Sequence, residues 1–560
     1  MDSLRRWLPF LSWPRPDATL LRGEASAGLT VALVMVPQSV AYAGLAGMPL
    51  VTGLYAAFLP ALVAVMFGSS TRLSVGPAAL TCVLVAASLT GMAERGSAHW
   101  VELAVWLSIL SGLIQLALGA GGFAWVLNLI SSPVLTGFTQ AAALLIIASQ
   151  LPALLGLSGP LASLWQQPQF DLPALGFGAA SLALLVVGKR LAPQLPMVLV
   201  VVAGAAVVSR FSGYSAGGAV IGALPSGLPS LYLPGLPGWE ALTQLLVPAM
   251  VIALVSFLET ASSAKIEAQR DNKRWNDNQD LIGQGLAKLT SALCGSFPTS
   301  TSFSRSAITL FAGARTGWSA LATAAFVLLA LLVLTPLLFH VPRAVLAAVV
   351  VAAVSGLLKP GALPRLWRID RVEAVTAGTT FAVTLLTAPR IYWGVLAGVL
   401  MGLTHFLHHR LHPRIIEVGL HPDGSLRDRH LWKLPPLAPH LYALRMDADL
   451  DFAAASDFER AIVEHLGAHP DVTHVCLFAQ PVNRIDATGV ETFGQIRRQL
   501  AARDITLHIS GIKLPVEKVL RGAGELPAGP MLKLYRTDAD ALVGLARLQL
   551  DPDDLAAVMI

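Results

Sequence analysis

The sequence predicts a polytopic α-helical membrane protein of about fourteen segments, followed by a small cytoplasmic α/β domain. Of its 560 residues, 54% are hydrophobic and 13% are charged, and the mean hydropathy is +0.64. These values are typical of membrane proteins. Charges are also uneven, because residues 103–188 contain only Asp171 whereas the chain after about His405 has a soluble composition. We therefore expect an N-terminal cytoplasmic segment at 1–24, a transmembrane domain at 25–405, a linker at 406–430 and a soluble domain at 431–560.

Apolar segments account for most of the expected transmembrane domain. Those of membrane length lie at 101–119, 123–146, 173–188, 196–209, 244–262, 318–339, 343–358, 371–387 and 390–404. Shorter or interrupted segments lie at 25–47, 51–67, 77–91, 281–296 and 305–313. Together they predict about fourteen passages, which places both termini on one side of the membrane.

The first segment is interrupted at Pro37–Pro49 by proline, glycine and polar side chains. From Ala25 to Thr90 the only charged residue is Arg72, so this backbone must lie in lipid. Lipid cannot satisfy unpaired backbone groups. We therefore expect this stretch to break the helix and to line a protein-enclosed cavity, as in a transporter core.

Two stretches rich in glycine, serine and threonine, Phe67–Leu80 and Cys294–Ile308, each lead into a short apolar helix. Their separation is about half of the transmembrane domain, which suggests two repeats with the second inverted. Two helix N-termini that face each other present amide donors and positive dipole ends to one small volume, which favours an anion. Arg305 would add a full positive charge, unless it lies at the cytoplasmic interface or pairs with a carboxylate.

Lysine and arginine cluster on one predicted side, in the N-terminal segment, at 189–190, at 265–280 and at 359–371. The opposite loops at 147–172 and 210–243 carry only Arg210. Both termini are therefore predicted to be cytoplasmic. The net charge of +5 reflects this topology, so we expect the lipid bilayer and not nucleic acid as the partner of these charges.

Several motifs resemble the SulP family of sulfate permeases and anion exchangers: Pro37–Tyr55, Ser74–Pro77, Asn278–Ala287, Ser302–Ser306 and Ala312–Thr316. The resemblance implies a seven-plus-seven inverted repeat with core and gate domains, an elevator-like motion and a homodimer. It also implies a substrate site between the third and tenth segments. In this sequence the residues that would line it are Gln38, Tyr42, Ala78, Phe303, Ser304 and Arg305.

Glu259 is a second charge within an expected membrane segment. It can bind and release a proton, or hold a cation together with nearby hydroxyls such as that of Ser263. The resemblance to bacterial relatives places the cation-coupling site at an acidic residue of the eighth segment, which is Glu259 here. The alternative is a structural ion pair with Arg305. We expect H⁺ as the coupling ion, with Na⁺ as the alternative, and no other cofactor.

The soluble domain shows strand patterns at 441–446 and 472–478 and helical spacing at 454–466 and 489–501. It resembles a STAS domain, whose characteristic turn matches Asp486–Gly489. In related anti-sigma-factor antagonists the second hydroxyl residue of this turn is phosphorylated, which maps onto Thr488. We favour a helix cap by Asp486 or Thr488, and a role of the domain in dimerisation and in regulation through a cytoplasmic protein partner.

Four histidines have the spacing of one helical face, as a metal site would: His405, His408, His409 and His412. They lie where the last segment meets the cytoplasm, so we favour interfacial anchoring and expect no metal. The absence of a phosphate-binding loop argues against an ATP-driven pump, and no enzymatic activity is expected.

The sequence thus predicts a secondary active transporter of small anions in a bacterial inner membrane. Its candidate substrates are sulfate, bicarbonate and a dicarboxylate. Three alternatives remain open: an uncoupled or exchange-type anion pathway, sodium-coupled bicarbonate uptake, and a membrane sensor that signals through its soluble domain.

Overall fold

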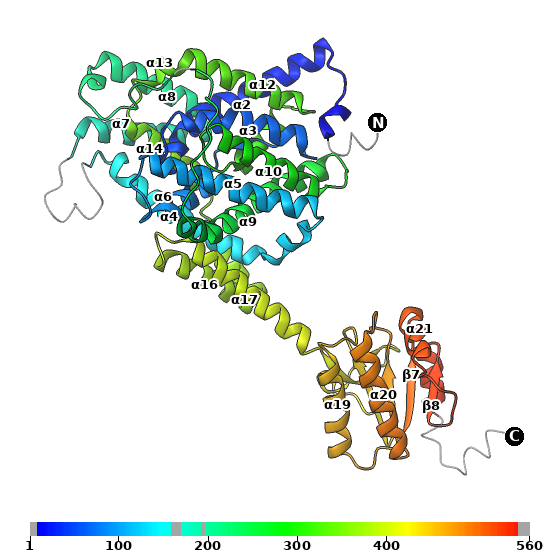
Figure 1. Ribbon diagram of the computed structural model, residues 1–560. Coiled ribbons are helices and arrows are strands. Elements are labelled where there is room, and N and C mark those ends of the chain that lie inside the picture. Colours follow the sequence, from blue (N-terminus) through cyan, green and yellow to red (C-terminus); the bar gives the residue numbers. More distant parts are fainter. Residues whose placement is uncertain (1–7, 158–169, 192–195, 226, 547–560) are drawn as a thin grey trace. The chain divides into compact units, whose positions relative to one another are not determined.

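The computed structural model describes residues 8–157, 170–191, 196–225 and 227–546. The chain divides into two compact units, Met1–Gly402 and Leu403–Ile560. The first unit is helical, and the second combines helices with a six-stranded sheet (Figure 1). The boundary expected at residue 405 lies within helix α17 (Tyr392–Leu411), which begins in the first unit and ends in the second.

The first unit contains two successive runs of elements, each with a two-residue strand followed by a short helix. The first run comprises α2 (Ala18–Leu45), α3 (Thr52–Phe67), β1 (Val75–Gly76), α4 (Ala79–Leu89), α5 (Ala98–Ala120), α6 (Ser132–Leu154), α7 (Leu172–Leu191) and α8 (Met197–Phe211). The second comprises α9 (Trp239–Arg270), α10 (Asp277–Leu293), β2 (Ser300–Thr301), α11 (Phe303–Phe311), α12 (Trp318–Leu329), α13 (Thr335–Leu338), α14 (Arg343–Ser355), α15 (Ala362–Ile369), α16 (Arg371–Leu386) and α17.

Six of the described helices are long and apolar enough to cross a membrane: α2, α5, α6, α7, α9 and the composite helix Trp318–Leu338. Helices α3, α4, α8 and α14 are apolar but shorter. A short helix can complete a passage when extended chain precedes it inside the protein, as β1 precedes α4. The chain is a multi-pass membrane protein, and its number of passages stays a prediction.

Two expectations about the first helices are wrong. Helix α2 continues through Pro37 to Leu45, because a buried helix tolerates the single hydrogen bond that a proline removes. The chain breaks later, at 46–51, where Gly47 has a φ of 71°. The segment expected at 123–146 starts instead with a 3₁₀ helix, Ala124–Leu129, and α6 begins at Ser132 with a proline in its first turn.

The helices of the first unit pack as two groups, as expected for core and gate domains. In the core group (α2–α5 and α9–α13), α10 packs against α3 and α5, and α12 packs against α2 and α3. In the gate group (α6–α8, α14, α16 and α17), α14 packs against α6 and α7, and α16 packs against α6. Helix α10 thus lies beside α3 and α5, although the chain separates them by more than a hundred residues (Figure 1).

The two extended stretches expected before short helices are present, and they pair with each other. Strands β1 and β2 are antiparallel, with Val75 opposite Thr301 and Gly76 opposite Ser300. Because the strands are antiparallel, α4 and α11 leave this ladder in opposite directions. Two helix N-termini therefore begin within a few residues of one two-stranded ladder in the core group.

Buried carboxylates hold the loop that precedes β1. Asp280 accepts hydrogen bonds from the backbone amides of Ser69 and Ser70, at 2.6 and 2.9 Å. Glu267 forms an ion pair with Arg72, with 3.2 Å between Oε1 and Nε. Both carboxylates belong to the second run of elements, so they fix the first run against the second next to the strand ladder.

The second unit contains a sheet with strand order β4-β3-β5-β6-β7-β8. Its strands are β3 (Ile415–Leu420), β4 (Leu426–Asp428), β5 (Leu441–Met446), β6 (His474–Phe478), β7 (Thr506–Ser510) and β8 (Leu532–Tyr535). Strands β5 to β8 are parallel, whereas β3 is antiparallel to both neighbours. The helices are α18 (Arg429–Trp432), α19 (Ala455–Ala468), α20 (Ala487–Ala502), α21 (Leu514–Gly522) and α22 (Asp538–Ala546).

The elements expected from the sequence of this domain are confirmed, but the linker is not. The expected strands at 441–446 and 472–478 are β5 and β6, and the expected helices are α19 and α20. The range 406–430 contains the end of α17 and strands β3 and β4, which extend the sheet. The short alternation of apolar residues around Ile416 and Val418 is the signal of a strand that the sequence analysis assigned to a linker.

Candidate functional site

Arg305 is the third residue of α11, and its side chain is 0% exposed and reaches the chain on both sides of β1. Its guanidinium donates hydrogen bonds to Ser74 Oγ at 3.2 Å, to Gln38 Oε1 at 3.4 Å and to the carbonyl oxygen of Pro77 at 2.9 Å. These three acceptors belong to α2 and to the chain around β1, which lie far from α11 in sequence. A full positive charge is therefore fixed directly behind the start of α4.

The other residues predicted to bind substrate divide into two sets. Gln38, Tyr42 and Ala78 are buried. Phe303 and Ser304, the first two residues of α11, are exposed, with Phe303 at 52%. The N-terminus of α11 is thus accessible, while Arg305 lies beneath it.

The N-termini of α4 and α11 supply the donors that an anion requires. The first amides of α4, as of any helix, have no intrahelical partner, and Ala78, which precedes α4 in an extended conformation, offers no side chain to cap them. At α11 the Ser302 hydroxyl accepts from the Arg305 amide at 3.5 Å. Free amides and the positive ends of two helix dipoles favour a small anion at this point.

Glu259 lies on α9 beside the strand ladder and is half-buried. Its carboxylate accepts a hydrogen bond from Ser300 Oγ, and Ser300 belongs to β2. Ser263, the other residue predicted to take part in cation coupling, is buried, and its hydroxyl donates to the backbone carbonyl of Glu259 at 3.2 Å. The ion pair between Glu259 and Arg305, which the sequence left as an alternative, is not among the ion pairs of the described residues.

Lys288 is a fully buried lysine that was not predicted from the sequence to be part of the site. Its ammonium donates to Gln115 Oε1 at 2.8 Å, and Gln115 Nε2 donates to Ser256 Oγ at 3.0 Å. Ser256 lies one turn before Glu259, and Ser300 Oγ contacts both the Ser256 carbonyl and the Glu259 carboxylate. The sequence contained a signal for Lys288, because a single lysine inside an apolar segment is a functional candidate by default.

Polar atoms without partners surround the ladder. Thr299 Oγ1 and Gln284 Oε1 are buried and form no hydrogen bond among the described residues. The Gln284 side-chain amide donates to Thr301 Oγ1 at 3.2 Å, and Thr301 shares a 2.9 Å hydrogen bond with Thr260. Buried polar groups without partners are rare, so this region retains capacity to bind water or an ion.

In the second unit, Asp486 caps helix α20. Its carboxylate accepts from the amides of Gly489 at 2.8 Å and of Phe452 at 2.9 Å. This confirms the helix cap and assigns it to Asp486. Thr488 is exposed in the first turn of α20, and its regulatory role stays a prediction.

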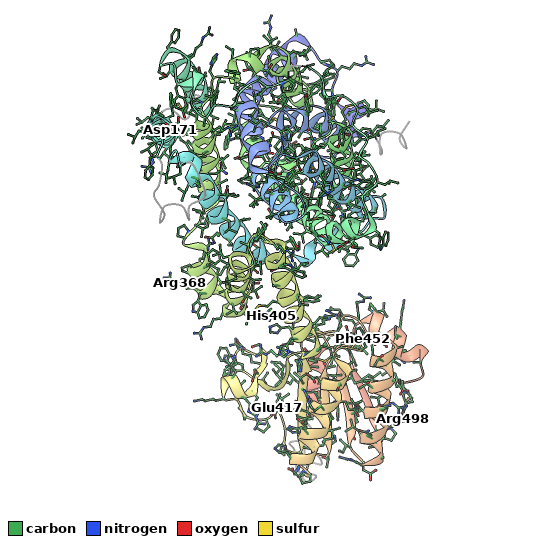
Figure 2. The ribbon with its side chains drawn as sticks, turned by 60° about the vertical axis from the view of Figure 1, so that its left-hand side comes forward. Asp171, Arg368, His405, Glu417, Phe452 and Arg498 are labelled. Carbon is green, nitrogen blue, oxygen red and sulfur yellow. The ribbon has the colours of Figure 1, made fainter. Side chains whose placement is uncertain are left out.

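The histidines at the end of the membrane domain pair along one helix. The rings of His405 and His409 are 4.4 Å apart between centroids, and those of His408 and His412 are 4.5 Å apart. His405 lies on α17 (Figure 2). Within the described part of the chain, no group of three or more histidine, cysteine, aspartate or glutamate side chains could hold a metal ion.

Comparisons with known proteins agree with this arrangement. The model of the sulfate permease family matches residues 21–380, and that of the STAS domain matches residues 436–541. A probable sulfate transporter of Mycobacterium tuberculosis is 32% identical over 519 residues, with 90% of this chain and 92% of the relative covered. The chloroplastic sulfate transporter 4.1 of Arabidopsis thaliana is 30% identical over 550 residues, with 93% and 78% covered.

Solved structures show the same fold. Murine solute carrier 26 family member A9, an anion transporter in the inward-facing state, aligns with a TM-score of 0.86 at 20% identity. The alignment covers 98% of this chain and 95% of the murine chain. At this identity the likeness concerns the fold alone.

Proposed function

Because this chain belongs to the sulfate permease family, we propose that it is a secondary active transporter that moves a small oxyanion together with a proton. The observation that carries the proposal is the pairing of β1 with β2, which brings two helix N-termini, Arg305 and Glu259 to one place. The family and its curated relatives support anion transport as the activity, and their names favour sulfate as the substrate.

The charge balance supports proton coupling. Arg305 donates to the Pro77 carbonyl beside β1, and Glu259 accepts from Ser300 of β2, so a buried cation and a carboxylate lie at the same ladder. When Glu259 is ionised the charges of these two side chains cancel, and when it is protonated the positive charge of Arg305 is left uncompensated. A bound proton therefore favours a divalent oxyanion, and a bound oxyanion favours the proton by the same coupling free energy.

The separation of the two groups of helices supports an elevator-like motion. The elements that form the candidate site, α2, α4, α9 and α11, all belong to the core group. The site can therefore move as one body against the gate group without breaking the contacts of Arg305. The exposed Phe303 and Ser304 mark the side from which an anion would enter in this conformation.

Three further features remain part of the proposal. The basic loops support cytoplasmic termini in a bacterial inner membrane. The resemblance supports a homodimer. The exposed Thr488 beside the Asp486 cap supports a protein partner of the STAS domain.

Counterflow in proteoliposomes tests the function. Vesicles containing the purified protein and preloaded with sulfate, bicarbonate or a dicarboxylate are assayed for uptake of labelled sulfate. We expect sulfate to drive the largest counterflow and a pH gradient alone to drive accumulation without sodium. Accumulation driven only by sodium would favour sodium-coupled uptake, exchange without accumulation would favour an uncoupled pathway, and no flux of any anion would favour a sensor.

A further inference from the structure

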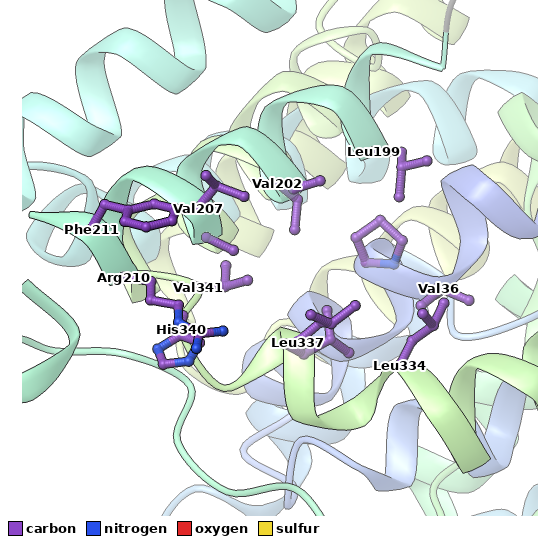
Figure 3. Close-up of a pocket in the computed structure, with 14 residues that line it drawn as sticks. Val36, Leu199, Val202, Val207, Arg210, Phe211, Leu334, Leu337, His340 and Val341 are labelled. Atoms are coloured by element: carbon purple, nitrogen blue, oxygen red, sulfur yellow. The ribbon is translucent and has the colours of Figure 1, made fainter.

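An apolar groove of about 280 Å³ lies between α2, α8 and α13, and none of the residues predicted to bind the anion lines it. We propose that it binds an acyl chain of an anionic phospholipid, whose phosphate group is held by Arg210 and His340. Figure 3 shows these two side chains next to each other at one end of the groove, while Leu199, Val36 and Leu334 lie at the other end.

The walls of the groove suit a hydrocarbon chain. Apart from Arg210 and His340, all of its side chains are apolar: Val36, Pro37, Leu199, Val202, Ala203, Ala206, Val207, Phe211, Leu334, Leu337, Leu338 and Val341. Leu337 and Val207 are 59% and 54% exposed, so the groove opens toward the surroundings of membrane-spanning helices, which are lipid. Each CH₂ group that enters contributes through dispersion contacts with close-packed walls.

A π-helical turn helps to form the groove. Residues Ala330–Leu334 depart from α-helical geometry and join α12 to α13. The turn shifts α13 relative to a straight continuation of α12, and Leu334 and Leu337 line the groove from this displaced segment. π-turns of this kind occur frequently at functional sites.

The cationic end suits a phosphate. Arg210 lies in the last turn of α8, and no described carboxylate forms an ion pair with it. His340 Nδ1 is buried and has no hydrogen-bond partner among the described residues. A guanidinium and an imidazole nitrogen without a partner are groups of the kind that bind a phosphate, and the end of a membrane helix is the depth at which lipid phosphates lie.

A second groove on the opposite face of α8 provides the contrast. It lies between α7 and α8, has a volume of about 580 Å³, and is lined by no charged residue. Acyl chains can lie in both grooves, but only the first has groups that recognise a head group. The first groove also lies between the core group and the gate group, so its occupant contacts both.

Lipid binding to the purified full-length protein tests the inference. Native mass spectrometry and thermal unfolding in detergent are used to compare dioleoyl phosphatidylglycerol with dioleoyl phosphatidylcholine, which has the same chains. We expect the anionic lipid to bind about tenfold more tightly, as a charge-assisted contact predicts. Glycerol phosphate, which lacks chains, is expected not to bind. Equal affinity for the two lipids, or tight binding of glycerol phosphate, would overturn the proposal.

Residues of α7, α8 and α13 provide matched variants. Arg210→Gln should abolish the preference for phosphatidylglycerol, whereas Arg190→Gln, at an exposed position of α7, should preserve it. Ala206→Phe should fill the first groove and weaken the binding of both lipids there. Ala205 lines the second groove, so Ala205→Phe should leave lipid binding in the first groove unchanged. Should Ala206→Phe fail to fold, Leu337→Trp blocks the groove from its other wall. A preserved preference in Arg210→Gln, or equal losses in Ala205→Phe and Ala206→Phe, would show ordinary annular lipid and contradict a specific site.

Discussion

Arg305 connects three parts of the chain through one buried guanidinium, so its removal affects both structure and binding. We expect Arg305→Ala to weaken anion binding by about 1.5 to 3 kcal/mol, because the charge behind the helix N-termini is lost. The melting temperature should also fall, since Gln38 Oε1, Ser74 Oγ and the Pro77 carbonyl lose their donor. Arg305→Lys should recover only part of the anion affinity, because an ammonium lacks the planar fork of donors that a guanidinium has.

Isothermal titration with sulfate measures the affinity, and thermal unfolding measures the stability. Arg315→Ala is the control, because Arg315 is exposed on the loop after α11 and its side chain forms none of these contacts. Wild-type affinity in a folded Arg305→Ala protein would exclude Arg305 from the site.

Glu259 carries the proposed coupling. Glu259→Gln keeps the size of the side chain and an acceptor for Ser300, but it mimics a permanently protonated carboxyl. We expect anion exchange to survive and gradient-driven accumulation to be lost, because the neutral amide no longer changes charge during the cycle. Proteoliposomes with a pH gradient and no sodium, and then the reverse, distinguish the two ions. Full gradient-driven uptake by Glu259→Gln under both conditions would refute the role.

His508 makes the second unit sensitive to acid. Its ring contacts His474 and the Tyr535 hydroxyl, each at 3.2 Å, and burial lowers the pKa of His508 from 6.5 to about 4. Below pH 6.5 the unfolded chain therefore takes up a proton that the folded domain does not bind until about pH 4. The stability of the domain should thus fall as the pH decreases from 6.5 toward 4.

Chemical unfolding of a fragment of residues 412–560 at pH 7 to 4.5 measures this effect. The unfolding free energy should depend less steeply on pH in His508→Gln. His474, whose pKa is also lowered by burial, will preserve part of this pH dependence. An unchanged slope in the variant would assign the acid sensitivity to other groups.

At the scale of elements, local patterns were sufficient for much of the fold but not for the pairing that forms the site. The glycine, serine and threonine content around Ser74 and Ser300 predicted extended chain before each short helix. The register of Val75 opposite Thr301 could not be predicted, because it depends on the packing of helices more than two hundred residues apart. The helix break predicted at Pro37 was wrong for a related reason, since tertiary packing overrides the local preference of proline.

Asp280 shows how such packing positions an element. It accepts hydrogen bonds from both Ser69 and Ser70, and from the Trp275 indole at 2.7 Å. Asp280→Asn leaves one acceptor oxygen for these donors, so we expect a loss of about 2 to 3 kcal/mol in stability. Anion affinity should fall as well, because the loop before β1 is no longer fixed. Asp277→Asn, one turn earlier, alters only local contacts with Asn278 and should have little effect. Equal melting temperatures of the two variants would contradict the positioning role.

At the scale of the whole molecule, the two units have separate interiors. The core of the second unit is formed by β5 to β7, α19 and α20 on one face of the sheet, and a second cluster with α22 lies on the other. The elements of the candidate anion site all lie before residue 312, within the first unit. Composition alone predicted this division, because a soluble domain and a membrane domain differ in their fraction of charged residues.

Truncation after Arg414 should therefore leave a membrane unit that folds and binds sulfate. This cut preserves α17, whose glycines pack closely on α16: an added Cβ at Gly394 would lie 1.9 Å from Thr384 Oγ1. Such contacts between small residues hold membrane helices together.

A longer truncation after Leu386 removes α17 and should destabilise the gate group, so it controls for the loss of membrane packing. Sulfate titration of the detergent-purified proteins measures binding, and proteoliposome uptake measures transport, which can fall if the soluble domain regulates it. Loss of sulfate binding by a folded protein that ends at Arg414 would show that the second unit completes the site.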